Sequence, residues 1–528
     1  MARGWSPLSV AGGFALDDQR EVISFLSDGA SYGMPGLSVE RIETHISIVF
    51  LVGDRAFKLK RAIRLSYLDY TTTALRGAFC RKELDLNLRT AASLYIQVRA
   101  ITRQAGGDLA FDGAGAVIDW VVEMRRFAQT DLFDQLAQAR KLNARLMRDL
   151  TDAIAEFHAA AAIVPRHGGR AGIQETIDGN NVNLVRSTPP LDARQIEGLY
   201  AASISKLAAV GSLLDSRREH GRVRRCHGDL HLRNICLFQG RPTLFDCIEF
   251  NDALSCVDVL YDLAFLLMDL VRRDLNELAS VVFNRYLDLT ADINGLSALP
   301  LLMSVRAAVR AHVMAALSQQ ARSTPALEES RAYLGLADTF LHPARPVVIG
   351  GLSGVGKSTI AQALASDFKP SPGARVVRSD VLRKRMFNVA PETKLPPSAY
   401  DHATTERVYT ALQDQVVAAL AAGYTAIADA TFLREEERRR IATCAERCGV
   451  PFVALWLEAP REILAARIGA RNSDASDADV AVLQQQLGFD IGTIEWQRLR
   501  AVADVTGTLA AVQDLIDQKR RGFGMVSK

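Results

Sequence analysis

The residues from Gly351 to Ser358 have the types and the spacing needed to bind the phosphates of a nucleotide. They read Gly-Leu-Ser-Gly-Val-Gly-Lys-Ser, which fits the pattern G-x-x-x-x-G-K-[ST]. The glycines let backbone N–H groups turn toward a phosphate, the lysine contacts the β- and γ-phosphates, and the hydroxyl that follows binds Mg²⁺. The predicted nucleotide-binding residues are Gly351, Ser353, Gly354, Val355, Gly356, Lys357, Ser358 and Thr359, and Ser358 is also a predicted metal ligand.

The residues on either side of this motif make the match specific. The apolar run Val347–Gly350 predicts a buried strand before the loop, and Thr359–Ala365 predicts the beginning of a helix after it. A helix N-terminus adds positive potential beside the bound phosphates. An incidental glycine-rich turn does not need this context, so the segment is predicted to be a functional P-loop.

Four further side chains near the P-loop have the chemistry to act on a phosphoryl group. Asp380 and Asp429 each follow a predicted strand, and carboxylates at the C-terminal edge of a parallel sheet face the ligand crevice. Asp380 is predicted to be a base for an attacking hydroxyl, with a water-mediated Mg²⁺ contact or a helix N-cap as alternatives. Asp429 is predicted to be a Mg²⁺ or substrate carboxylate. Arg467 and Arg471, four residues apart, either close over the transferred phosphate or are surface arginines.

A second chemical pattern lies in the middle of the chain. The segment from His227 to Asn234 reads His-Gly-Asp-Leu-His-Leu-Arg-Asn, so that Asp229 and Asn234 are five residues apart, and Asp246 follows twelve residues after Asn234. In a kinase catalytic loop, an aspartate in this position orients the acceptor hydroxyl and the asparagine binds Mg²⁺. The residues 235–244 predict a hairpin that returns Asp246 to Asn234. We therefore predict Asp229 as catalytic, and Asn234 and Asp246 as metal ligands.

An ATP site of this kind also needs a lysine on a strand and a glutamate on the next helix. Lys58 lies in a predicted strand at the expected place, but Lys60 shares its face because side chains alternate along a strand. Lys58 is the favoured nucleotide-binding lysine, and Glu83 is its predicted partner unless it belongs to a solvated helix face. The chain has no G-x-G-x-x-G before this strand, so the loop that covers the phosphates is predicted to lack that glycine pattern or the site to be partly degenerate.

Two types of secondary structure must position these residues. Before the proposed linker His342–Pro346, a hairpin at 44–60 is followed by a helical pattern over 72–100, a strand over 117–127, and mostly helical patterns from 131 onward. After the linker, strands and helices alternate, which predicts a parallel sheet between helices. The further predicted strands of that sheet are 376–378, 426–429 and 452–457.

Composition limits the class of protein. Apolar residues make up 48% of the 528 residues, and 63 basic residues face 60 acidic ones, for a net charge of +3. This balance does not suggest a nucleic-acid-coating or membrane-surface protein. Seven scattered cysteines without a C-x-x-C pair indicate thiols in a reducing compartment. No signal-type leader is seen, and no uninterrupted apolar run approaches the roughly 20 residues of a membrane span. We therefore expect a cytoplasmic protein.

The motifs resemble two known families. The P-loop with Asp380, Asp429 and the arginines resembles small P-loop kinases of the gluconate kinase, chloramphenicol phosphotransferase and polynucleotide 5′-kinase type, over about 346–505. The His-Gly-Asp-Leu-His segment resembles the aminoglycoside phosphotransferase family, a choline kinase-like branch of the protein-kinase fold. Together they resemble the bacterial bifunctional aminoglycoside phosphotransferase/ATP-binding proteins. The resemblance implies a two-lobed α+β kinase-like domain at 1–342 and a three-layer α/β P-loop domain with a parallel sheet at 346–528.

The sequence thus favours an ATP- and Mg²⁺-dependent phosphotransferase that acts on a hydroxyl of a small-molecule acceptor. Two alternatives stay open. One is a nucleotide-sensing regulatory protein with a catalytically weak module, which the missing glycine-rich loop favours. The other is a polynucleotide 5′-kinase-like enzyme, against which the near-neutral charge and the lack of a basic–aromatic stripe argue.

Overall fold

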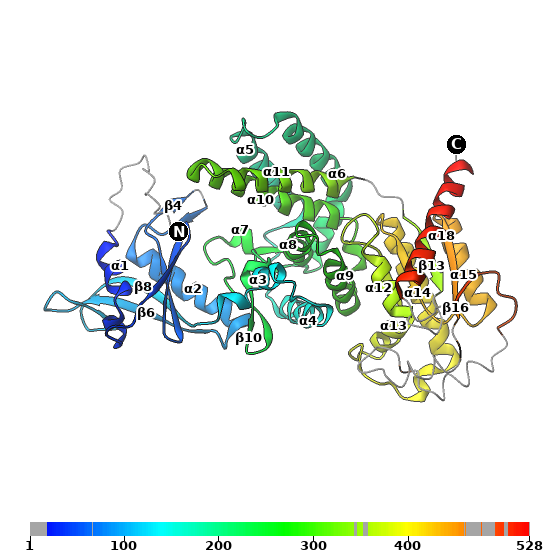
Figure 1. Cartoon of the computed structure of the whole chain (residues 1–528), viewed down its shortest axis with the longest axis horizontal. Helices are drawn as coiled ribbons and strands as arrows, with labels where there is room; N and C mark the ends of the chain where they lie inside the picture. The colour runs from blue at the N-terminus through cyan, green and yellow to red at the C-terminus, as the bar shows by residue number, and fades with distance from the viewer. Residues whose placement is uncertain are drawn as a thin grey trace. The chain divides into compact units, whose positions relative to one another are not determined.

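The computed structural model describes residues 18–65, 67–342, 346–351, 357–458, 460, 477, 491–500 and 505–526. The chain divides into two compact units. The first comprises the residues up to 139 together with 227–229 and 233–255, and the second comprises 140–226, 230–232 and the residues from 256 onward. Figure 1 shows the elements of both units along the chain.

The first unit is built on a six-stranded antiparallel sheet, with strand order β1-β2-β3-β8-β6-β7. Its strands are β1 Glu40–Glu43, β2 Ser47–Val52, β3 Arg55–Lys60, β6 Tyr95–Arg103, β7 Leu109–Phe111 and β8 Ala116–Arg125. The predicted β2–β3 hairpin is confirmed, although the first of its strands begins at Ser47. The residues 44–46 form the turn from β1, a strand that was not predicted.

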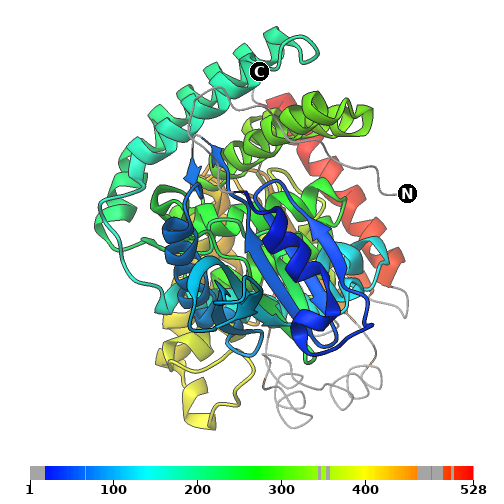
Figure 2. The same ribbon diagram turned by 90° about the vertical axis from the view of Figure 1, so that its left-hand side faces the viewer.

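The two faces of this sheet pack against different helices. On one face, α1 (Arg20–Ser27) crosses the strands (Figure 2) and buries Val22 and Leu26 beside Phe50 and Phe57. The 3-10 helix η1 (Gly29–Tyr32) follows α1. On the other face, α2 (Thr73–Ala91) buries Cys80 in a core with strand residues. The two alternating faces of β3 therefore enter two separate apolar cores.

The helical pattern predicted over residues 72–100 was wrong at its C-terminal end. The helix α2 begins after Thr72, whose hydroxyl accepts a hydrogen bond from Leu75 N, and it ends at Ala91. Residues from Tyr95 onward form β6, which pairs with β8. In this segment Ile96 and Val98 alternate with polar residues, which suits a strand. Pairing with β8 therefore prevails over the continuing helical spacing.

The remaining elements of the first unit are short. A turn at Gln239 and Gly240, both with positive φ, joins β10 to β11 in the predicted antiparallel hairpin, as two-residue hairpin turns of the primed types require. The bounds are β4 Arg64–Leu65, β5 Leu68–Asp69, η2 Gln129–Asp131, α3 Phe133–Gln138, β10 Ile235–Phe238, β11 Arg241–Leu244 and α7 Asp252–Ser255. The 3-10 turn η3 covers Leu232–Asn234 at the boundary of the two units.

The second unit begins with a helical region. Its core helix α8 is buried at every residue from Val259 to Val271. The helices are α4 Ala144–Ala160, α5 Gly169–Val185, α6 Ala193–Glu219, α8 Val259–Arg272, α9 Asn276–Thr290, η4 Ile293–Gly295, α10 Leu299–Ala321 and α11 Thr324–Leu341, and a two-stranded sheet pairs β9 Val223–Arg225 with β12 Cys256–Asp258.

One described helix is long and apolar enough to cross a membrane by length and composition alone. It is the segment Leu299–Gln319 of α10, and 61% of its most apolar window is buried inside the protein. The helix packs against α8 and α11. Core helices of globular proteins have the same composition, so this segment is weak evidence for a membrane span.

The second unit continues with a five-stranded, all-parallel sheet of order β14-β15-β13-β16-β17. An apolar core joins one face to α12 and α18, while α14 and α15 contact strands of the sheet as well. This is the predicted α/β fold with a parallel sheet. The bounds are β13 Val348–Gly351, α12 Lys357–Ala365, β14 Arg375–Arg378, α13 Ser379–Met386, η5 Pro397–Tyr400, α14 His402–Ala421, β15 Ala426–Asp429, α15 Glu435–Arg447, β16 Phe452–Glu458, β17 Gln497–Arg500 and α18 Val505–Val526.

Within the second unit, a polar contact joins α9 to the edge strand β14. The Asn284 amide donates to Ala374 O at 3.1 Å, and its side-chain oxygen accepts from Val376 N at 2.8 Å. The buried Arg375 guanidinium lies 2.7 Å from Asp288 of the same helix. The helical region and this end of the parallel sheet are therefore held together by side-chain-to-backbone hydrogen bonds as well as by charge.

Candidate active sites

In the first unit, strand β3 places Lys58 opposite the predicted glutamate. Lys58 Nζ lies 2.8 Å from Glu83 Oε1 and also contacts the carboxylate of Asp246. Glu83 is completely buried on α2. Burial disfavours the charge on Lys58, but the carboxylates of Asp246 and Glu83 outweigh it and raise its pKa well above the ordinary lysine value. The Lys58–Glu83 pairing is thus formed as the sequence predicts.

Lys60 is part of the same charged cluster. Its Nζ lies 2.5 Å from Glu83 Oε2 and contacts the carboxylate of Glu249. Tyr70 Oη donates to Glu249 Oε1 at 2.5 Å. The Lys60 side chain is 1% exposed and that of Lys58 is 12% exposed. Of the two lysines, Lys58 contacts Asp246, whose side chain is 41% exposed, whereas Lys60 contacts the buried Glu249.

The segment from Asp229 to Asn234 is held in a loop by hydrogen bonds between its two ends. Asn234 Nδ2 donates to Asp229 O at 2.9 Å and to Asp229 Oδ2 at 2.8 Å. His227 Nε2 donates to Phe245 O at 2.9 Å, because a carbonyl oxygen can only accept. Gly228 has a φ of +85°, and a Cβ there would lie 2.9 Å from Leu254 O. The glycine of the motif is therefore required by both the backbone conformation and the space.

The β10–β11 hairpin brings Asp246 back to this loop, as predicted. Phe245 N donates to Asn234 O at 3.0 Å, immediately before Asp246. Asp246 has a φ of +66°, which is uncommon for a residue with a side chain. Its backbone is held in this conformation because Cys247 N donates to Asn87 Oδ1 at 3.0 Å. The carboxylate is thus presented by a fixed backbone, next to Lys58.

The turn between β1 and β2 consists of Thr44, His45 and Ile46, and it contains no glycine. Thr44 N donates to Ser47 O at 2.9 Å, and Ser47 N donates to Thr44 Oγ1 at 2.9 Å. Partial burial lowers the pKa of His45, while the charge of Asp229 acts in the opposite direction. This turn is stabilised by the Thr44 side chain and needs no glycine.

Two other features of the first and second units do not belong to this site. A cavity of about 520 Å³ lies on the α1 face of the sheet, lined by residues that include Phe57 and Arg55. Lys58 alternates to the opposite face of β3. Among the described residues, His158, Cys226 and Asp262 each place a potential metal-ligand atom within 4.8 Å of the others. Both ring nitrogens of His158 already contact Tyr286 and Asp262, at 2.9 and 3.2 Å, so this buried group is a hydrogen-bond network.

In the parallel sheet of the second unit, β13 ends at Gly351, where the predicted P-loop begins. Gly351 is opposite Asp429 in the β13–β15 register, and α12 begins at Lys357. Thr359 lies exposed in the first turn of α12. Residues 352–356, which include Ser353, Gly354, Val355 and Gly356, lie outside the described residues, as do the side chains of Lys357 and Ser358. The predicted strand and helix therefore flank the motif in the expected order.

Asp429 and Asp380 lie at the ends of neighbouring strands. Asp429 is buried at the end of β15 and pairs in register with Arg378, whose Nε lies 3.6 Å from Asp429 Oδ2. Asp380 is in the first turn of α13, whose N-cap is Arg378. The alternative interpretation of Asp380 as the N-cap was therefore wrong, because the helix begins at Ser379, two residues earlier than that interpretation assumed. Arg467 and Arg471 lie outside the described residues.

Comparisons with known families match two separate segments of the chain. Residues 105–299 match a family described as "Phosphotransferase enzyme family", and residues 347–489 match a family described as "AAA domain". The chain joins a phosphotransferase domain to a P-loop kinase-like domain. Asp229, Asn234 and Asp246 lie within the first matched segment, and the Gly351–Ser358 motif lies within the second, while Lys58 and Glu83 precede the first.

Relatives of the whole phosphotransferase–P-loop chain are found in mycobacteria. The chain is 28% identical over 467 residues to the uncharacterized protein Rv2004c of Mycobacterium tuberculosis (strain ATCC 25618 / H37Rv). The match covers 85% of this chain and 90% of that protein. The same values hold for the uncharacterized protein Mb2027c of Mycobacterium bovis. The two domains therefore occur together in these relatives as well.

Several solved structures match parts of the chain at low identity. A choline/ethanolamine kinase family protein from Mesorhizobium loti is 15% identical, with coverage of 61% of this chain and 94% of that one and a TM-score of 0.38. Aminoglycoside 2′-phosphotransferase-IIIa is 14% identical, with coverage of 61% of this chain and 99% of that one and a TM-score of 0.35. A gluconokinase from Sinorhizobium meliloti 1021 is 16% identical, with coverage of 35% of this chain and 98% of that one and a TM-score of 0.26.

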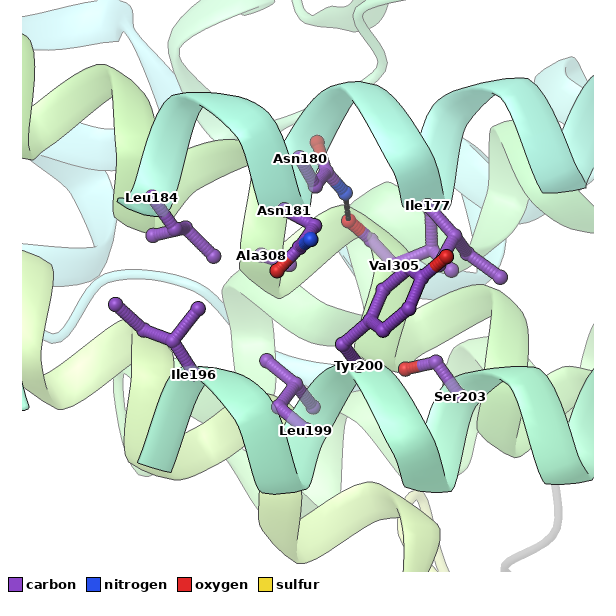
Figure 3. Close-up of a pocket in the computed structure, with 10 residues that line it drawn as sticks. All are labelled: Ile177, Asn180, Asn181, Leu184, Ile196, Leu199, Tyr200, Ser203, Val305 and Ala308. Carbon is purple, nitrogen blue, oxygen red and sulfur yellow. Dashed lines mark hydrogen bonds between the residues drawn. The ribbon is translucent and has the colours of Figure 1, made fainter. Parts of the chain in front are cut away.

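The helical part of the phosphotransferase–P-loop chain contains a small pocket between α5, α6 and α10 (Figure 3). Asn180 Nδ2 donates across it to Val305 O at 3.1 Å. Its volume of about 20 Å³ has room for about one water molecule. An acceptor molecule of the size of a sugar does not fit there, so this pocket is not proposed as the acceptor site.

Sequence reasoning about the cluster around Lys58 and Glu83 missed two participants. Glu249 follows Asp246 by three residues, and Tyr70 lies before α2. No local sequence pattern connects Glu249 to a lysine 189 residues away. The one available signal was that Glu249 lies in the same short segment as Asp246.

Proposed function

We propose that the protein transfers the γ-phosphoryl group of ATP to a hydroxyl of a small-molecule acceptor, and that it has a second ATP-binding module in its P-loop domain. The observation that carries the proposal is the meeting of Lys58, Glu83 and Asp246 in one cluster, with Asn234 bonded to Asp229 at the end of the hairpin that carries Asp246. The proposed domains span 1–342 and 346–528.

The roles in the first domain follow from charge and exposure. Lys58 would contact the phosphates of ATP, since it is the more exposed of the two lysines and has a raised pKa. Asp246 and Asn234 supply carboxylate and amide oxygens, the donor types that hold Mg²⁺, and the Asp246 carboxylate is partly open to solvent. Bound Mg²⁺ would neutralise charge on the phosphates.

Asp229 would orient the acceptor hydroxyl and accept its proton. Its carboxylate receives the Asn234 amide at 2.8 Å, which fixes the orientation of one oxygen. Glu83 would hold Lys58 in place from the buried side. Before the nucleotide binds, the Lys58–Asp246 ion pair partly neutralises both groups, so binding of Mg-ATP requires this pair to separate.

In the P-loop domain, the proposed ATP ligands are the loop amides with Lys357 and Ser358. Asp429 would bind Mg²⁺, Asp380 would face the acceptor, and Arg467 or Arg471 would stabilise the transferred phosphoryl group. The assignment of Asp429 is supported by its position opposite Gly351, the first residue of the P-loop motif, in the sheet. The seven cysteines are free thiols, which fits the proposed cytoplasmic location. A nucleic-acid acceptor is disfavoured by the net charge of +3.

A phosphate-transfer screen tests this function directly. The intact chain is incubated with γ-labelled ATP and Mg²⁺ against sugars, aminoglycosides, choline-like alcohols, nucleosides and a 5′-hydroxyl oligonucleotide. We expect transfer to at least one small alcohol that depends on Asp229 or on Asp380. Nucleotide binding without transfer to any class would instead favour a nucleotide-sensing protein, and transfer confined to the oligonucleotide would favour an end-processing kinase.

Asp380→Asn is expected to lower transfer by the P-loop domain by about 10²–10⁴-fold while leaving ATP binding nearly unchanged. The reason is that a general base contributes to the chemical step and not to nucleotide affinity. The measurement combines nucleotide titration and transfer rate in a chain whose first domain is inactivated by Asp229→Ala. Asp401→Asn, which removes the exposed N-cap carboxylate of α14, is the control. Loss of nucleotide binding with unchanged transfer per bound ATP would make Asp380 a metal or structural residue.

A further inference from the structure

Lys58, Lys60, Glu83, Glu249 and Tyr70 form a buried network that links three separate segments of the first unit. Glu83 uses both carboxylate oxygens, at 2.8 Å from Lys58 Nζ and 2.5 Å from Lys60 Nζ. Lys60 also contacts Glu249, and Tyr70 Oη donates to the same Glu249 oxygen at 2.5 Å. The network therefore connects β3 to α2 and to the segment from Asp246 to Glu249.

The two lysines of this network have different access to a ligand. Lys60 is 1% exposed and lies between two carboxylates, 5.0 Å from the Tyr70 ring centroid. Burial opposes its charge, but Glu249 and Glu83 outweigh it and raise its pKa above the ordinary value. Lys60 is thus held in its charged form and enclosed by its partners, so we expect its role to be exerted through them.

The buried ion pair between Lys60 and Glu249 carries a desolvation cost. Buried ion pairs often contribute no more to stability than well-packed apolar residues of the same size, since both charges lose their hydration. What Lys60 and Glu249 add is a fixed geometry. Glu83 stays attached to β3 through Lys60 even when Lys58 turns toward a ligand, and Glu249 attaches the segment that carries Asp246 to the same strand.

We infer that Lys60 and Glu249 are a positioning pair that holds Glu83 and the Asp246–Glu249 segment in the arrangement needed to bind Mg²⁺ and nucleotide. This inference rests on the proposed function of the first domain. With only one lysine, the Lys58–Glu83 contact would be the sole charged link from α2 to β3, and it would be weakened whenever Lys58 contacts phosphate. With Lys60 present, the exchange of Lys58 from Asp246 to the phosphates leaves α2 in place.

The test is the Mg²⁺ dependence of nucleotide binding in the intact chain. The parent protein carries Lys357→Ala, so that the P-loop domain does not contribute, and the probe is trinitrophenyl-ATP fluorescence titrated over a range of Mg²⁺ concentrations. The Lys60→Met/Glu249→Gln double variant removes both charges together, which avoids the larger destabilisation of leaving one buried charge unpaired. Thermal unfolding of each variant checks that the fold is retained.

We expect the Mg²⁺ concentration for half-maximal binding to rise by about 10–100-fold in the double variant, because residues that support metal ligands have effects of this size. Binding without Mg²⁺ should change by less than about threefold, since Lys58 is retained. Glu249→Gln alone keeps a hydrogen-bond acceptor for Lys60 and should show a smaller rise. It also keeps the inference testable if the double variant does not fold.

Lys82→Met/Asp252→Asn is the matched control. This ion pair also joins α2 to the segment after Asp246, at 2.9 Å, but both side chains are about one-third exposed. It should leave the Mg²⁺ dependence unchanged. A folded Lys60→Met/Glu249→Gln variant with the parental Mg²⁺ dependence would overturn this inference but not the proposed function of the first domain. A parent that binds no nucleotide at any Mg²⁺ concentration would overturn the proposed function of the first domain as well.

Discussion

Asp246→Ala is expected to weaken one of two Mg²⁺-dependent nucleotide sites in the intact chain until a titration no longer detects it, while Asp229→Ala leaves both sites occupied. Asp246 would bridge the metal and the phosphates, so its loss leaves triphosphate charge poorly compensated in a partly buried site. We expect affinity at that site to fall by about 100-fold or more, which corresponds to about 3 kcal/mol. Both variants should lower transfer by this domain by about 10²–10⁴-fold.

Calorimetric titration of ATP, in the presence and in the absence of Mg²⁺, measures the number and the affinity of the nucleotide sites. Asp85→Ala, which removes an exposed carboxylate on α2 two residues after Glu83, is the control and should bind like the wild type. Equal nucleotide binding by the wild type and by both active-site variants would show that the assigned division of roles is incorrect. A wild type with a single site that Asp246→Ala does not affect would favour the regulatory interpretation of the first domain.

Lys357→Ala is expected to remove the other nucleotide site. Its ammonium group would contact the terminal phosphates, and no other lysine occurs between Gly351 and Ser358 to replace it. The wild type should bind two nucleotides, Lys357→Ala and Asp246→Ala one each, and the combined variant none. The exposed Lys369, beyond the end of α12, provides the control as Lys369→Ala. Unchanged stoichiometry in folded Lys357→Ala would refute the P-loop assignment.

Much of the fold was predictable because the decisive signals are local. The strand before Gly351 and the helix beginning at Lys357 are adjacent in sequence to a specific loop motif, and the Gly240 turn indicated the hairpin that carries Asp246. The error in the 72–100 segment has a different origin. The pairing of β6 with β8 depends on residues that lie beyond the segment itself, so helical spacing was a poor guide to the end of α2.

The candidate site was predictable only as far as its motifs extend. Alternation along β3 placed Lys58 and Lys60 on one face but could not choose between them, and the structure uses both against Glu83. The contact of Lys60 with Glu249 spans 189 residues, and it arises from the packing of three segments. Burial also could not be read from sequence: it is burial that separates a lysine open to ligand from one enclosed by carboxylates.

The contact between α9 and β14 has a consequence for how the protein can be divided. β14 is an edge strand, and such strands expose unpaired backbone groups that can recruit a strand from another molecule. Asn284 uses its side-chain amide to satisfy backbone groups on both sides of Arg375, as a neighbouring strand would. A fragment that begins after residue 342 loses this cover and leaves Arg375 without Asp288. Such a fragment is expected to self-associate through β14, whereas the intact chain keeps that edge protected against aggregation.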